Sequence, residues 1–231
     1  MSTESLSTEF VTTKYTTVEQ GLHPEVAALV AQYTVFQAFQ HPTVASADGM
    51  GSDTHSVYGD PLMDSLMLFL LPVVEEATGL FLYPTYSYYN LYKPGDEMHP
   101  HTDRPSNEIT VTVNLGSHYI HVDPGYKWGI SIDGYEEKQN PGDMFIYRGT
   151  ELTNWRTPFE GEKGSWHSQA SFGYVNVDGP YSFCKYDTRP NLGYPQSSRN
   201  QDHLNFALQL MEKNKEAKTQ TTEGFIFLTN E

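Results

Sequence analysis

The feature that most constrains the fold is a run of strict alternation between residues 108 and 115. Every second residue is apolar, namely Ile109, Val111, Val113 and Leu115, and the residues between them are polar, namely Thr110, Thr112 and Asn114. Successive side chains of a β-strand point to opposite faces, so this period predicts a strand with one face on an apolar core. Further short strands are expected at 80–92, 119–122, 129–132, 144–147 and 168–175. Turn sequences separate them, which predicts an antiparallel sandwich or jelly roll.

Helices are expected on both sides of this β-rich region. A helical spacing of apolar residues follows Pro24, and a second helix should begin at Pro61, with Asp60 as its N-cap and Gly79 at its end. We expect the buried face of this second helix to carry Leu62, Leu66, Phe69, Val73 and Ala77.

Four other segments have weaker signals. Residues 40–58 have the composition of a loop, and residues 1–20 are expected to form a loose arm or one edge strand. Near the end of the chain, residues 202–213 predict a closing helix and residues 224–229 a late edge strand. All of these segments are expected to belong to one domain spanning residues 1–231.

Composition and charge limit the classes of protein. With 231 residues, 38% of them hydrophobic, the chain can bury a sizeable core. A net charge of −15 disfavours general binding to nucleic acid or to anionic membranes. The single Cys184 excludes an intrachain disulfide and suits a reducing compartment. No signal peptide is evident and the longest apolar run, 66–74, is too short to cross a bilayer, so we expect a cytoplasmic protein.

A metal-binding pattern precedes the alternating strand. In His101-Thr-Asp103 an imidazole and a carboxylate are two residues apart, so near a strand end both point the same way and can hold one cation. Two histidines and one carboxylate are the usual ligands of non-haem Fe(II) in oxygenases. An H-x-D triplet is a weak signal by itself. The chain has a second one, His121-Val-Asp123, which we interpret as an edge histidine followed by a turn.

The motifs around the first triplet form an ordered set. In chain order they are a tyrosine-rich strand, H-x-D-R-P at His101, the alternating strand, Pro141-Gly-Asp, Tyr147-Arg-Gly, Asn154-Trp-Arg and Asp187-Thr-Arg-Pro. This order, over residues 57–193, resembles the prolyl-hydroxylase-like branch of the iron(II)/2-oxoglutarate-dependent dioxygenase superfamily. It is most similar to a bacterial and phage group with H-x-D-R-P and H-W-R motifs. The resemblance implies a double-stranded β-helix, or jelly roll, with iron held by His101, Asp103 and a histidine at position 154.

The chain departs from the family at this third ligand, because position 154 is asparagine. In one interpretation Asn154 lends its carbonyl oxygen to iron or leaves the position to water, although an amide is a weak Fe(II) ligand. In a second, His167 replaces the missing imidazole. In a third, the site is degenerate and the chain is a non-catalytic relative. The sequence leaves all three open.

The co-substrate implied by the resemblance, 2-oxoglutarate, needs a basic anchor for its distal carboxylate, preferably a buried arginine. Arg156 follows Asn154 by two residues, so a strand puts both on one face, and we favour it. The alternative anchors are Arg104, Arg148 and Lys163. Hydroxyl or amide contacts near the cavity are expected from Tyr92, Thr112 and Asn114.

The resemblance implies an oxygenase that uses Fe(II), 2-oxoglutarate and O2 to oxidise, by default to hydroxylate, a C–H bond of a small molecule, amino acid or peptide. Two alternatives from other classes are a jelly-roll binding or structural protein without catalysis, and a cupin-like metalloenzyme that uses no 2-oxoglutarate. Succinate formation would separate the oxygenase from both, and metal content would separate the other two.

Overall fold

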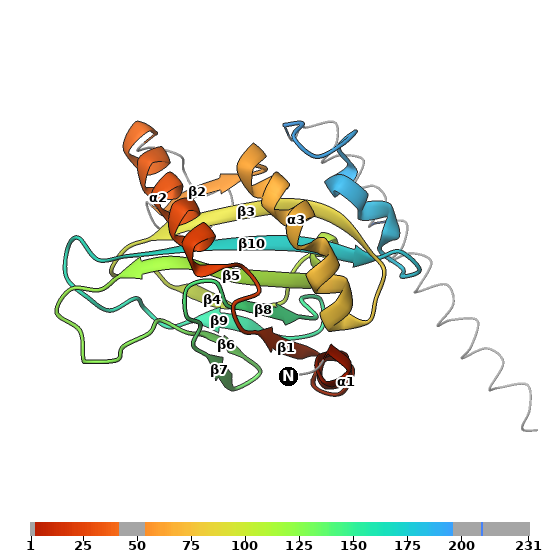
Figure 1. Cartoon of the computed structure of the whole chain (residues 1–231), viewed down its shortest axis with the longest axis horizontal. Coiled ribbons are helices and arrows are strands. Elements are labelled where there is room, and N and C mark those ends of the chain that lie inside the picture. The colour runs from red at the N-terminus through yellow and green to blue at the C-terminus, as the bar shows by residue number, and fades with distance from the viewer. Residues whose placement is uncertain (1–2, 42–53, 196–208, 210–231) are drawn as a thin grey trace, which may run out of the picture.

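The computed structural model describes residues 3–41, 54–195 and 209 of the chain, and two antiparallel sheets dominate it (Figure 1). The larger sheet has six strands in the order β1 (Tyr15–Val18), β8 (Met144–Tyr147), β5 (Ile109–His118), β10 (Trp166–Asn176), β3 (Leu82–Tyr92) and β2 (His55–Tyr58). The smaller sheet has four strands in the order β4 (Met98–His101), β9 (Asn154–Arg156), β6 (Ile130–Ile132) and β7 (Tyr135–Glu137). This is the jelly-roll architecture that the turn-separated strands predict.

Helices lie against one face of the larger sheet (Figure 1). They are α1 (Thr3–Thr13), α2 (Pro24–Gln40) and α3 (Pro61–Thr78), and two short 3₁₀ segments are η1 (Pro105–Asn107) and η2 (Ser182–Thr188). The apolar set of β5 packs in the core beneath the helices, as its alternation predicts, and consists of Ile109, Val111, Val113 and Leu115. Its polar set faces away from the helices, toward the space between the sheets. No helix in the described ranges is both long and apolar enough to cross a membrane.

Helix α3 begins and ends where its capping residues predict. Oδ1 of Asp60 accepts hydrogen bonds from the backbone N–H groups of Leu62 and Met63 at 2.9 and 3.2 Å. At the other end, Gly79 adopts a left-handed conformation with φ 70°, which costs a residue without Cβ little.

The predicted buried face of α3 is wrong for two of its five residues. Phe69 and Leu62 are 71% and 40% exposed, whereas Val73 is half-buried and packs against the core, and Leu66 and Ala77 are buried as expected. The observed buried stripe carries Met63, Leu66, Met67, Leu70, Val74 and Ala77. Because α3 is apolar around most of its circumference, spacing alone allows several stripes. Tertiary contacts choose among them, and one is the buried carboxylate of Asp64, which accepts a hydrogen bond from Ser87 at 2.7 Å.

Three local expectations are also corrected. Residues 119–122 do not form a strand, because His121 adopts φ 51°, which an extended chain cannot contain. The segment 40–58, expected to be a loop, ends in strand β2, which forms through pairing with β3. Within residues 1–20, Thr3–Thr13 form helix α1, which was not predicted, and Tyr15–Val18 form the edge strand β1, which was one of the two expected alternatives. The segments 202–213 and 224–229 lie outside the described residues, except for residue 209.

Candidate active site

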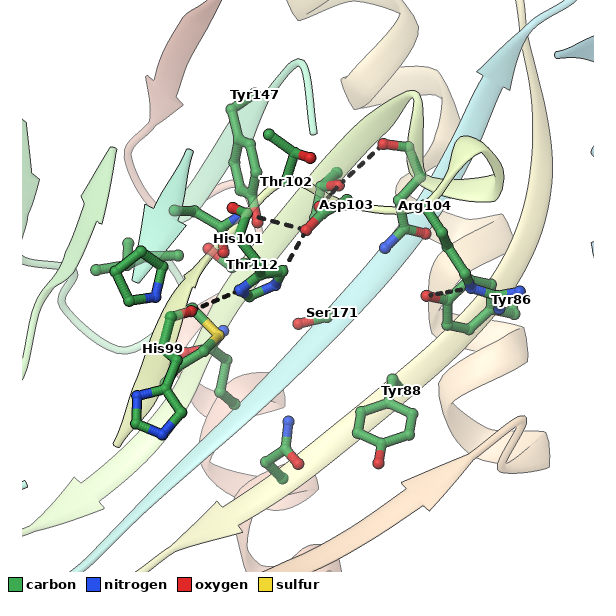
Figure 2. A pocket seen from close by; sticks show the side chains of 18 of the residues that line it. Tyr86, Tyr88, His99, His101, Thr102, Asp103, Arg104, Thr112, Tyr147 and Ser171 are labelled. Atoms are coloured by element: carbon green, nitrogen blue, oxygen red, sulfur yellow. Dashed lines mark hydrogen bonds and ion pairs between the residues drawn. The ribbon is translucent and has the colours of Figure 1, made fainter. Parts of the chain in front are cut away.

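A cavity of about 440 Å³ lies between the two sheets (Figure 2). Strand β3 contributes alternate residues to its wall, namely Tyr86, Tyr88, Asn90 and Tyr92. Neighbouring strands add Thr110 and Thr112 from β5 and Gln169 and Ser171 from β10. Because side chains alternate along a strand, each of these strands presents one set of residues to the cavity and the other to the helix-covered core.

His101 and Asp103 point toward one another at the edge of this cavity (Figure 2). Nε2 of His101 lies 3.5 Å from Oδ1 of Asp103. Nδ1 of His101 donates to the carbonyl oxygen of His99 at 2.8 Å, because a carbonyl can only accept. This tautomer leaves the Nε2 lone pair for a cation, as in metal sites whose histidines are oriented by an outer hydrogen bond.

The carboxylate of Asp103 is fixed by the neighbouring strand. Its side chain is 8% exposed, and Oδ2 accepts a hydrogen bond from the hydroxyl of Thr110. Its backbone N–H donates to the carbonyl oxygen of Gly149 at 2.8 Å. Oδ1 is thereby directed toward His101, and the two donor atoms suit one divalent cation such as Fe(II).

Asn154 lies directly beside this pair, because β4 and β9 pair with His101 opposite Asn154. Its Nδ2 donates to the carbonyl oxygen of His101 at 3.2 Å and to Oδ1 of Asp103 at 3.1 Å. Both neighbours are acceptors, so the nitrogen of the amide has to face them, and a nitrogen that donates cannot also coordinate a metal. In the part of the chain that the structure describes, no group of three His, Cys, Asp or Glu side chains is placed to hold a metal ion.

Arg156 extends from the same strand face as Asn154, and both are buried. Its Nη1 donates to the carbonyl oxygens of Trp128 and Gly129 at 3.0 and 3.3 Å, and its Nη2 donates to Oε1 of Gln169, a cavity residue. The guanidinium carbon lies 4.6 Å from the ring centre of Trp128. Burial lowers the pKa of Arg156 from its ordinary value, because the charged form loses its hydration.

Arg156 differs from the other arginines of the described residues in its partners. The others each have a carboxylate within 4 Å, in the pairs Arg104–Asp187, Arg148–Glu151 and Arg189–Asp64. For Arg156 the described residues offer only neutral acceptors, and its buried Nε has no hydrogen-bond partner among them. A buried guanidinium without a carboxylate is suited to a carboxylate ligand.

Solved structures resemble this arrangement of strands and helices. The epimerase SnoN from nogalamycin biosynthesis, in complex with Fe3+, α-ketoglutarate and nogalamycin RO, gives a TM-score of 0.62 at 14% identity, over 84% of this chain and 92% of that one. A Pseudomonas putida prolyl-4-hydroxylase gives 0.55 at 14% identity, over 75% and 99% of the two chains. The chain has the fold of the iron(II)/2-oxoglutarate oxygenases. No sequence-family model and no curated protein sequence matches it.

Within this oxygenase fold, His167 does not lie beside His101 and Asp103. Its ring is buried in β10, with Nδ1 at 3.0 Å from the hydroxyl of Tyr119, and it does not line the cavity. Burial first, and then the positive charge of Arg156, lowers its pKa well below the ordinary value, so the imidazole is neutral at pH 7.

The remaining predicted site residues divide between the cavity and other places. Tyr92 and Thr112 line the cavity. Asn114 does not, and its Nδ2 donates to the carbonyl oxygen of Gln139 at 2.9 Å. Of the alternative anchors, Arg104 lines the cavity, Arg148 pairs with Glu151 away from it, and Lys163 is exposed. In the second triplet, His121 is exposed and pairs with Glu162 at 2.7 Å.

Several cavity residues were not predicted from the sequence. Tyr86, Tyr88 and Asn90 share a period of two with Tyr92, and Gln169 and Ser171 repeat it on β10. That period could have identified them. It was hidden because the opposite face of β3 is also aromatic, with Tyr89 in the core, so the strand shows no contrast between polar and apolar faces.

Proposed function

We propose that this protein is an Fe(II)- and 2-oxoglutarate-dependent oxygenase that oxidises a C–H bond of a small-molecule substrate. The observation that carries the proposal is the convergence of Nε2 of His101 and Oδ1 of Asp103 at a cavity in a jelly roll of this class. The SnoN and Pseudomonas putida structures support the class through their folds.

His101 and Asp103 would hold the iron, with Asn154 beside them. The hydrogen bonds that Asn154 and Thr110 make to Asp103 hold its carboxylate in place, so the two ligand atoms need little reorganisation on binding. When bound, iron with 2-oxoglutarate and O2 supplies the oxidising power.

Arg156 would bind the distal carboxylate of 2-oxoglutarate. It is buried, it has no carboxylate partner among the described residues, and it reaches the cavity wall through Gln169. A carboxylate at Arg156 would replace the neutral oxygen of Gln169 with a charged acceptor, which makes the stronger hydrogen bond. The surrounding rings of Tyr92 and Trp128 exclude water from this ion pair, which strengthens it.

The test is an anaerobic titration of the Fe(II)-loaded protein with 2-oxoglutarate, followed by the weak visible absorption of the iron chelate. Arg156→Lys keeps the charge but loses the planar pair of donors, so we expect its 2-oxoglutarate affinity to fall by about tenfold or more, or about 1.4 kcal/mol. The control is Arg148→Ala, which removes a guanidinium outside the cavity and should leave the titration unchanged.

Other outcomes of this titration identify the competing functions. Iron bound by His101 and Asp103 without any absorption on adding 2-oxoglutarate would favour a cupin-like metalloenzyme. Absence of iron binding would favour a jelly roll without catalysis. Succinate formation in the presence of O2 separates the oxygenase from both.

A further inference from the structure

The cavity beyond His101 and Asp103 offers no net charge to a substrate. Its wall there contains the guanidinium of Arg104, whose Nη1 and Nη2 donate to the two carboxylate oxygens of Asp187 at 3.0 and 2.9 Å. The Nε of Arg104 donates to the hydroxyl of Tyr86 at 3.3 Å. The paired charges of Arg104 and Asp187 cancel, and a substrate carboxylate or phosphate at Arg104 would lie near the buried negative charge of Asp187.

Two uncharged groups in the same wall have hydrogen-bonding capacity to spare. Oδ1 of Asn90 accepts from the hydroxyl of Ser56 at 2.5 Å, which fixes the amide, but its Nδ2 has no partner among the described residues. The hydroxyl of Ser171 likewise has none within the described ranges. The two residues line the cavity from adjacent strands, because β3 pairs with β10 with Asn90 opposite Gln169 and Tyr88 opposite Ser171. Both groups are open to the cavity, so a ligand that enters it can form hydrogen bonds with them in place of water.

Aromatic rings surround these groups. Tyr86, Tyr88 and Ser171 lie around the same space in Figure 2, and Tyr92 continues the row of rings along β3. A tyrosine offers an apolar ring face for stacking and a hydroxyl for hydrogen bonding. A volume of about 440 Å³ falls within the range of pockets for small molecules, which is about 300–1,000 Å³.

We propose that the substrate is an uncharged ring compound with several hydroxyl groups, a sugar or glycoside, held by Asn90 and Ser171 with its ring against Tyr86 and Tyr88. The oxidation of this substrate rests on the proposed function, whereas its binding does not. A free amino acid fits less well, because both of its charges would enter a cavity wall where Arg104 is already paired with Asp187.

The test is calorimetric titration of the metal-free protein with three matched probes. The methyl glycosides of glucose, glucuronic acid and glucosamine share one ring and are neutral, anionic and cationic at pH 7. We expect the neutral glucoside to bind about tenfold more tightly than either charged probe, because only the charged probes lose hydration without gaining a counter-charge.

Two variants localise the binding. Ser171→Ala should weaken binding of the glucoside by about fivefold or more, since one neutral hydrogen bond is lost. Ser131→Ala is the matched control, because Ser131 is also a half-buried strand serine and lies on β6 outside the cavity wall. It should leave binding unchanged.

Equal or tighter binding of the glucuronide or the glucosaminide would overturn the proposal, as would no measurable binding of the glucoside, or equal loss in the two serine variants. The titrations are repeated with Zn(II) and 2-oxoglutarate present. Failure of the protein to bind Zn(II) or 2-oxoglutarate would refute the proposed oxygenase, while the metal-free titrations would still decide whether the cavity selects uncharged rings.

Discussion

At position 154 an amide lies where the motif pattern that the sequence resembles has its second imidazole. Two acceptors surround its nitrogen, the carbonyl oxygen of His101 and Oδ1 of Asp103, so the side chain acts as a hydrogen-bond donor to both residues. We infer that Asn154 positions Asp103 and that His101 and Asp103 are the principal protein ligands. A cation held by two side chains would retain more positions for water, co-substrate and O2 than one held by three.

Asn154→His should therefore tighten metal binding by about tenfold or more, because an imidazole is a better ligand for Fe(II) than an amide that donates to Asp103. Calorimetry with Mn(II) or Ni(II) measures the change without O2 chemistry. His167→Gln is the comparison, and we expect its affinity to stay within about twofold of the native protein, because His167 lies outside the cavity. A greater loss in His167→Gln than in Asn154→Ala would contradict this assignment.

His101→Ala should reduce metal affinity by more than about a hundredfold, beyond the effect of changing an outer hydrogen-bond partner. The second H-x-D triplet provides the control. His121 is exposed and pairs with Glu162 on the surface, so His121→Ala should leave metal binding unchanged. Equal losses in the two variants, measured by the same calorimetry, would show that the wrong triplet was chosen.

Among the elements, η2 explains the late motif Asp187-Thr-Arg-Pro. Tyr186, Asp187 and Thr188 all have positive φ, at 56°, 54° and 61°, a conformation that costs non-glycine residues about 1–3 kcal/mol each. This backbone conformation brings Asp187 to Arg104, the residue after Asp103. The carboxylate of Asp187 also accepts hydrogen bonds from the hydroxyls of Tyr58 and Ser106 at 2.7 Å each. The buried carboxylate therefore offsets the strain and ties η2 to the segment that carries Asp103.

Asp187→Asn should lower the free energy of unfolding by about 2 kcal/mol, because it removes the fully buried carboxylate that pairs with the guanidinium of Arg104, whose side chain is 34% exposed. Urea denaturation at pH 7 measures the change. Glu151→Gln is the matched control, since it also neutralises an arginine partner, but at a surface where Glu151 is 41% exposed. We expect its effect to be less than about 1 kcal/mol. Similar losses for both variants would argue against a special role for η2.

For the whole molecule, the buried ring of His167 links stability to pH. Its pKa is lowered in the folded state, so as pH falls below about 6.5 the unfolded chain binds a proton that the folded protein does not. The stability contributed by the neutral ring is present above the unfolded pKa and is lost as pH falls, with a slope of up to about 1.4 kcal/mol per pH unit. His55, whose pKa burial also lowers, adds to the slope in the same direction.

His167→Gln should reduce this slope below pH 6.5, whatever its effect on stability at pH 7. Urea denaturation at half-unit steps between pH 5 and pH 8 measures it. An unaltered slope in His167→Gln would mean that other groups dominate acid destabilisation.

The sequence by itself determined the features that depend on neighbours along the chain. The alternation of β5, the caps of α3 and the strand bounds of β8 follow from side-chain period, capping chemistry and turn residues, all of which act over a few positions. The same local geometry predicted that Asn154 and Arg156 share a face, and the structure confirms it.

Tertiary structure alone decided which partners these side chains meet. The buried face of α3 includes Asp64, whose partner Ser87 lies on β3. Arg156 has no carboxylate partner because Asp187 and Glu151 pair with other arginines. Asn90 and Ser171 line the same cavity because of the register in which β3 pairs with β10. A register error of one residue would turn each strand's cavity face to the core. Such partners are set by pairing between segments far apart in the sequence, and local patterns carry no record of that pairing.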